Sequence, residues 1–214
     1  MNFIRFAIIG FFSILFLVVY CSAPVSATHP AATIPAFPGA EGFGSNAKGG
    51  RGGTVYLVTN LDDAGTGSLR NCVIASGPRI CVFRIGGTIE LQSELTIRNP
   101  FITIAGQTAP GGGITLKAAA GKILDPIKIE TYEVIIRYIR SRPGTKQQSA
   151  RALSMSTGGS CLHYNYGSDP NGCGPRVHNV IIDHSSFSWA GDELTIAWYT
   201  TNNVTLSWNI YSES

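Results

Sequence analysis

The stretch His178-Asn179-Val180-Ile181-Ile182 contains a pattern that repeats along the chain, a turn residue followed by alternating aliphatic side chains. It occurs again at residues 99–104, 132–136 and 202–206. Intervals of 32, 46 and 24 positions separate the equivalent residues Ile102, Val134, Val180 and Val204. We interpret the second interval as two units, and the first as one unit plus the glycine-rich stretch 111–113. A repeat of about 23 residues then fits all three intervals.

A unit of this length carries short β-branched runs, such as residues 114–117 and 127–129, and cannot bury its apolar face alone. It must stack on its neighbours, which predicts an all-β parallel β-helix. Leucine-rich repeats need several leucines per unit, whereas Ile and Val dominate here. An antiparallel sandwich is the competitor, but its hairpins need Asn-Gly or Asp-Gly turns, and the sequence has only Asn171-Gly172.

A short helix is predicted just before the repeats. Leu69, Val73 and Ile74 have helical spacing, Ser68 can cap the first turn, and Gly77-Pro78 follows the end. Such a helix could cover one end of the stack.

The N-terminus resembles a secretory signal peptide. Arg5 precedes an apolar run from Phe6 to Tyr20, and a small-residue cleavage pattern ends at Ala27. A lipoprotein anchored through Cys21 is the alternative, which the bulky Tyr20 disfavours. We expect residues 1–27 to be removed, residues 28–214 to form the β-helix domain, and the mature protein to be secreted and free of the membrane. Its net charge is then about +2, because Arg5 is the only charged residue lost.

Cysteine usage agrees with an oxidising compartment. Without Cys21 the set is even, and four thiols allow three pairings. We favour the two local disulfides, Cys72 with Cys81 and Cys161 with Cys173, because each closes a short loop. No pair has the C-x-x-C spacing typical of zinc sites.

Several blocks, in order, resemble the secreted pectate lyases of polysaccharide lyase family 1. They cover nearly the whole mature chain: residues 36–44 (AFPGAEGFG), 49–61 (GGRGGTVYLVTNL), 65–70 (GTGSLR), 86–91 (GGTIEL), 104–111 (IAGQTAPG) and 181–189 (IIDHSSFSW). The resemblance implies a right-handed, single-stranded parallel β-helix that cleaves polygalacturonate (pectin) by calcium-dependent β-elimination.

The resemblance also implies an arginine base on coils that lie beyond Ser214. We therefore expect the β-helix to be incomplete at its C-terminal end, the catalytic base to be unassigned within the chain, and the 214-residue form to be inactive. A monomer is expected.

Asp192 occupies the position where the family has an acidic calcium ligand, and Glu193 is the alternative. A solvated acidic turn is an equal interpretation, because calcium takes about 6–8 oxygen ligands and one carboxylate does not establish a site. The sequence departs from the family at two places. Arg151 stands where relatives often have Asp, and Ile196 stands where some have a second acid.

A run of cations occurs without any acid between Glu133 and Asp169. It is interpreted either as a solvated rim or as a groove that attracts polyuronate. Export and the lack of a nucleic-acid motif argue against nucleic acid as the partner. The cations are Arg137, Arg140, Arg142, Lys146 and Arg151.

Asp183-His184-Ser185 suggests a catalytic triad, but consecutive strand residues point to opposite faces. We interpret Asp183 and His184 as a structural hydrogen-bonding pair.

Asn203-Val204-Thr205 is a glycosylation sequon. The aromatic residues Trp189, Trp198, Tyr199 and Trp208 suit either sugar stacking or core packing. Two functions remain open, a pectate lyase and a non-catalytic β-helix that binds acidic polysaccharide.

Overall fold

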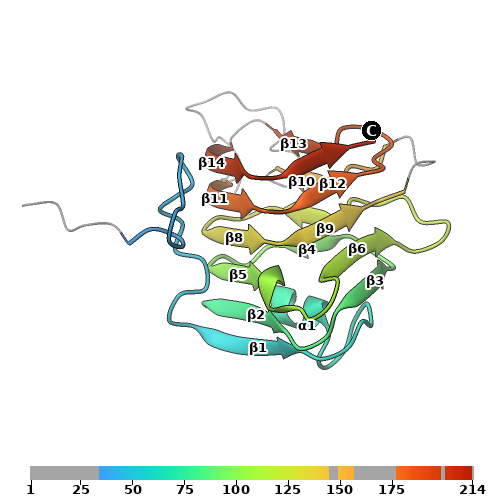
Figure 1. The fold of residues 1–214 in the computed structure, drawn as a ribbon, viewed down its shortest axis with the longest axis horizontal. Helices are drawn as coiled ribbons and strands as arrows, with labels where there is room; N and C mark the ends of the chain where they lie inside the picture. Colours follow the sequence, from blue (N-terminus) through green and yellow to red (C-terminus); the bar gives the residue numbers. More distant parts are fainter. Residues whose placement is uncertain (1–33, 145–148, 157–176, 199–200, 214) are drawn as a thin grey trace, which may run out of the picture. The chain divides into compact units, whose positions relative to one another are not determined.

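The structure is a computed structural model, and it describes residues 34–144, 149–156, 177–198 and 201–213. These residues form three sheets of parallel strands, and successive coils of the chain contribute neighbouring strands to each sheet (Figure 1). Sheet A contains, in spatial order, β1 (Thr54–Val58), β2 (Arg79–Phe83), β5 (Ile102–Ala105), β8 (Val134–Arg137), β11 (His178–Asp183) and β14 (Asn202–Ser207).

Sheets B and C complete each coil. Sheet B contains β3 (Gly87–Leu91), β6 (Ile114–Ala118), β9 (Ile139–Arg142), β12 (Ser186–Ser188) and β15 (Ile210–Ser212). Sheet C contains β4 (Leu95–Ile97), β7 (Ile127–Ile129), β10 (Leu153–Met155) and β13 (Thr195–Ala197). The chain passes from A to B to C and returns to A one strand further along. The predicted parallel β-helix is thus confirmed.

Strand register corrects the repeat length. Val134 of β8 pairs directly with Val180 of β11, so the 46-residue interval is one coil and not two. That coil also supplies β9 and β10, and long connections on either side of β10 account for its extra length. By contrast, Ile102 pairs with Val134, and Val180 pairs with Val204, as the sequence alignment predicted.

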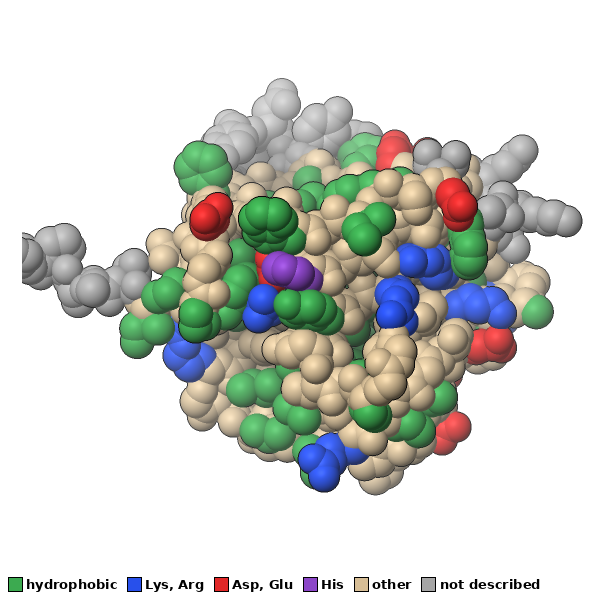
Figure 2. Space-filling view, in the orientation of Figure 1, with side chains coloured by type: hydrophobic (Ala, Val, Ile, Leu, Met, Phe, Trp, Pro, Cys, Tyr) green, Lys and Arg blue, Asp and Glu red, His purple; other side chains and the backbone are tan. Residues whose placement is uncertain are grey.

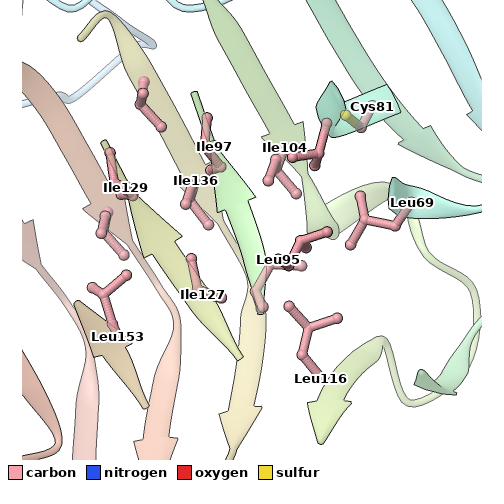
Figure 3. Close-up of a cluster of buried hydrophobic side chains, with 14 of the residues drawn as sticks. Leu69, Cys81, Leu95, Ile97, Ile104, Leu116, Ile127, Ile129, Ile136 and Leu153 are labelled. Carbon is pink, nitrogen blue, oxygen red and sulfur yellow. The ribbon is translucent and has the colours of Figure 1, made fainter. Parts of the chain in front are cut away.

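Aliphatic side chains from all three sheets fill the interior (Figure 3). The strand register places aliphatic side chains of successive coils next to one another. Ile104 pairs with Ile136, and Leu95 and Leu153 both pair with Ile127. Burial of each such side chain stabilises the fold by about 1.5–3 kcal/mol. The interior is therefore continuous along the coils, and no coil could form it alone.

The predicted helix is confirmed as α1 (Leu69–Ile74), with Ser68 accepting a hydrogen bond from the Asn71 amide as its N-cap. It lies between β1 and β2, where later coils have strands of sheets B and C, and it packs against β1, β2 and β4. The disulfide Cys72–Cys81, also as predicted, joins α1 to β2. A short 3₁₀ helix, η1 (Gly106–Thr108), was not predicted. Among the described residues, no helix has the length and apolar character needed to cross a membrane.

Arg79 is fully buried beside α1 and makes no ion pair with a described carboxylate. Its guanidinium instead donates to main-chain carbonyls at the end of α1, including Cys72 at 2.9 Å and Val73 at 2.7 Å, and to Pro100 at 2.9 Å. Burial lowers the pKa of Arg79 to about 10, so the group is still charged at neutral pH. Arg79, on β2, therefore connects α1 to the residues that lead into β5.

The glycine-rich segment before β1 lies along the outer face of sheet A. Ala47 packs there with Ile135 and Ile181. The Gly44 amide donates to Thr205 Oγ1 at 2.8 Å, and a Cβ at Gly44 would collide with the carbonyl oxygen of Val180. Only glycine allows so close an approach to the sheet. This contact gives a physical reason for glycine in the opening block.

Candidate functional site

The first candidate site is the corner between sheets B and C, where Arg151 precedes β10, and Asp192 and Glu193 precede β13. The amides of Gly191 and Asp192 donate to the Ala150 carbonyl at 3.0 and 3.3 Å, which holds the two turns together. Arg151 Nε donates to Glu193 Oε2 at 2.8 Å, and its Nη2 donates to the Asp192 carboxylate. The two predicted acids therefore share one guanidinium.

Two further groups position Arg151. Its main-chain amide donates to Asp125 Oδ1 at 2.7 Å, and its guanidinium carbon lies 5.9 Å from the centre of the Trp198 ring. A hydrogen bond from its own backbone amide, and then one from the Arg151 guanidinium, hold the pKa of Glu193 below its usual range. Arg151, Asp192 and Glu193 together carry one net negative charge at neutral pH.

This corner does not fit calcium as it stands. Calcium takes about 6–8 oxygen ligands, whereas the guanidinium of Arg151 occupies both carboxylates. In the described part of the chain no three His, Cys, Asp or Glu residues are grouped so that they could hold a metal ion. Ile196, on β13, adds no oxygen.

The second candidate site is the corner between sheets A and B, around Asp183 and His184. Asp183 Oδ2 accepts from Arg137 Nε at 2.9 Å and lies 2.7 Å from His184 Nδ1, while Oδ1 accepts from the Ser207 hydroxyl at 2.7 Å. The two neighbours meet because His184 has a φ of +50°, which ends the alternation of the strand. Burial alone would raise the pKa of Asp183, but these hydrogen bonds outweigh it and lower the pKa.

The basic run does not form one surface. Arg137 pairs with Asp183 and covers the Phe37 ring at 3.8 Å. Arg142 donates to the carbonyl and hydroxyl oxygens of Ser186 at 2.8 and 2.7 Å. Arg151 lies at the other corner, and Arg140 is exposed on β9. Lys146 lies outside the described residues.

Of the remaining predicted residues, some are exposed and others lie outside the described residues. Trp189 and Trp208 are exposed, and Trp189 lies 5.8 Å from the Arg142 guanidinium carbon. Asn203 is exposed at the start of β14, and its side-chain amide donates to Asn179 Oδ1 at 3.2 Å. Tyr199, Cys161 and Cys173 lie outside the described residues.

Four residues that complete these sites were not predicted from the sequence, although a signal was present for the first two: Ser207, Tyr138, Phe37 and Asp125. Arg137, Asp183 and Ser207 each stand three positions after the aligned residues of the repeat, and the register pairs them. Tyr138, His184 and Trp208 stand four positions after, and Tyr138 and His184 stack at 4.9 Å. Phe37 and Asp125 carried no comparable signal, because neither belongs to the repeat pattern.

Comparison with known proteins gives relatives named as pectate lyases. The chain is 38% identical over 186 residues to "Probable pectate lyase C" of Aspergillus terreus, which covers 86% of this chain and 38% of the relative. It is 40% identical over 190 residues to the protein of the same name in Aspergillus oryzae, covering 88% and 39%. "Probable pectate lyase 18" of Arabidopsis thaliana is 32% identical over 183 residues, covering 79% and 40%. No family model matches the chain.

Among solved structures, the crystal structure of Jun a 1, the major allergen from cedar pollen, superposes with a TM-score of 0.53 at 20% identity. It covers 77% of this chain and 46% of that chain, and at this identity the likeness concerns the fold alone. The chain spans less than half the length of the curated relatives that it matches. It is thus a parallel β-helix similar in sequence, over that portion, to proteins named as pectate lyases.

Proposed function

We propose that this chain belongs to a secreted pectate lyase, a protein that cleaves polygalacturonate by β-elimination. The observation that carries the proposal is an identity of about 40% over 179–190 residues with fungal proteins named as probable pectate lyases. The parallel β-helix and the expected signal peptide support it. Family 1 membership, the substrate and secretion all form part of this proposal.

β-Elimination removes the proton next to a uronate carboxylate, so negative charge builds up on that carboxylate and a cation must stabilise it. Calcium supplies that cation in the family that the sequence resembles. Here Arg151 occupies both acids at the corner between sheets B and C, so we derive no step through calcium. No residue of the chain is assigned as the base.

A non-catalytic protein that binds acidic polysaccharide is the second candidate. The observation that favours it is the same corner, where a guanidinium stands between the two carboxylates and the net charge is negative. A protein that only binds polysaccharide needs no group to stabilise the negative charge that develops during elimination. Exposed cations elsewhere, such as Arg140, are enough to attract a polyuronate.

The two candidates are separated by incubating the gene product with polygalacturonate, in a calcium series and with a chelator. A lyase generates unsaturated uronides, which absorb in the ultraviolet. Flat absorbance of the full-length gene product at every calcium concentration, together with retention on a pectin matrix, would exclude the lyase and favour the binding protein.

A pair of variants of the full-length gene product tests whether the corner of Arg151, Asp192 and Glu193 takes part in the lyase reaction. If this corner takes part, Asp192→Asn should lower turnover on the order of 10²-fold, because it misplaces Arg151 and Glu193. Glu90→Gln, which removes a carboxylate from the exposed ion pair with Lys117 on sheet B, should leave turnover unchanged. Equal rates for both variants would place the reaction elsewhere.

A further inference from the structure

A groove lies on the outer face of sheet B, away from the corner that holds Arg151. One hollow of about 610 Å³ lies between Tyr138, His184 and Trp208 on one side and the glycine loop 111–113 on the other. A second hollow of about 460 Å³ continues from the same loop to Thr88 on β3. Figure 2 shows hydrophobic, histidine and cationic side chains close together on one face of the molecule.

The floor of this groove is a straight row of side chains that are polar except at its last position. Register places one residue of each successive strand of sheet B in the row, in the order Thr88, Thr115, Arg140, Ser186 and Ile210. Neighbouring strands are about 4.8 Å apart, so the row runs along the direction in which the coils stack. A linear row with hydroxyl groups suits a linear polymer that carries many hydroxyls.

Arg140 lies at the centre of the row and lines both hollows. Its side chain has no hydrogen bond or ion pair within the described residues, whereas Arg137 and Arg151 have carboxylate partners and Arg142 is bound to Ser186. Burial, and then the nearby charge of Arg140, lower the pKa of Arg142, whereas the charge of Glu213 raises it. An exposed guanidinium without a described partner attracts a carboxylate, with which it can form paired hydrogen bonds.

The two walls differ in character. Tyr138 and His184 stack at 4.9 Å, and Trp208 lies 6.3 Å from His184 and is 75% exposed. Aromatic surface of this kind packs against the C–H faces of sugar rings. On the other side, a Cβ at Gly111 or Gly112 would meet nothing within 4 Å, so the loop leaves its main chain open to a ligand.

We propose that this groove binds an acidic polysaccharide chain at a site separate from the corner of Arg151, Asp192 and Glu193. Arg140 binds a uronate carboxylate, the aromatic wall packs against a neighbouring ring, and Thr88 and Thr115 contact hydroxyls. The groove anchors the protein on its polymer. The class of ligand rests on the proposed function, but the site does not require that the protein be a lyase.

The test is titration calorimetry of the protein with a short oligogalacturonate and with its methyl ester. Arg140→Gln should weaken binding of the acid roughly tenfold, the value of one charge-assisted hydrogen-bonded contact. Trp208→Ala should weaken it several-fold. Arg98→Gln is the matched control, because it removes one exposed positive charge at the end of β4, outside the groove. The methyl ester should bind more weakly to the wild type and be insensitive to Arg140→Gln.

Each outcome decides the proposal. No binding by the wild type, no loss with Arg140→Gln, or an equal loss with Arg98→Gln would overturn the groove. Thermal midpoints of the Arg140 variant should match the wild type, since that side chain is exposed and holds no described partner. Lyase absorbance is recorded in parallel. Flat absorbance of the full-length gene product, together with intact, Arg140-dependent binding, would refute the proposed lyase and leave the groove standing.

Discussion

Each coil turns from sheet A into sheet B at one corner and from sheet B into sheet C at another. The two corners differ in construction, although the same coils form both. At the corner with sheet A, one or two residues join β8 to β9, β11 to β12 and β14 to β15, and Tyr138, His184 and Trp208 in these turns all adopt positive φ. Turns of nearly constant length keep side chains of successive coils in register, so they stack. At the corner with sheet C, ten residues separate β9 from β10 and six separate β12 from β13. Arg151 there meets Asp192 and Glu193, which follow it by 41 and 42 residues in the sequence.

Burial differs as well. The Asp183 side chain is 2% exposed, whereas those of Asp192 and Glu193 are 34% and 48% exposed. A buried, fully bonded carboxylate contributes mainly to stability, and exposed ion pairs contribute little. The corner with sheet A therefore contributes more to the stability of the fold than the corner with sheet C.

The largest expected effect separates the two corners by stability. Asp183→Ala should lower the free energy of unfolding by about 3 kcal/mol or more, because it leaves Arg137 without its carboxylate. Glu193→Ala should cost at most about 1 kcal/mol. Urea unfolding measures both. Similar losses in the two variants would mean that the corners do not differ in the way described.

A second prediction concerns pH and the same aspartate. The folded-state pKa of Asp183 is lowered, so its carboxylate contributes stability that is complete above its unfolded pKa of about 3.9. This contribution is lost as pH falls through the lowered pKa. The stability difference between wild type and Asp183→Asn should therefore be constant near neutral pH and shrink in acid. A difference that grows as the pH falls would contradict this assignment.

The smallest expected effect is a gain of weak metal binding at the corner with sheet C. Arg151→Gln frees Asp192 and Glu193, and calcium should then bind with a dissociation constant on the order of 10⁻⁴–10⁻³ M, the range of weak extracellular sites. Terbium luminescence reports binding, because Trp198 lies close to Arg151 and can sensitise the ion. The wild type is the control. Equally tight binding by the wild type would show that Arg151 does not block the site.

Much of the fold could be predicted from local pattern. The aligned residues Ile102, Val134, Val180 and Val204 do pair in order, and Ser68 does cap a helix at the expected position. The division of the long interval into two coils was wrong, because spacing alone does not distinguish a second coil from long connections within one. Register decides this, and register depends on contacts between strands distant in the sequence.

The sites were less predictable, since their partners are brought together by the coils. The sequence contains Arg151, Asp192 and Glu193, but their ion pairs span 41 and 42 residues. The absence of acids within the basic run suggested free cations. The structure instead pairs two of them with acids outside the run, leaves Arg140 exposed, and does not describe Lys146.

The sequence by itself determined the parallel β-helix, the capped helix and the Cys72–Cys81 disulfide, because turn residues, alternating aliphatics and short loop closure act over a few neighbouring positions. Only the tertiary structure decided which charges are paired, which aromatic rings stack and where a groove opens. Those properties depend on which residues of successive coils come into register, and the lengths of the connections set that register across tens of residues.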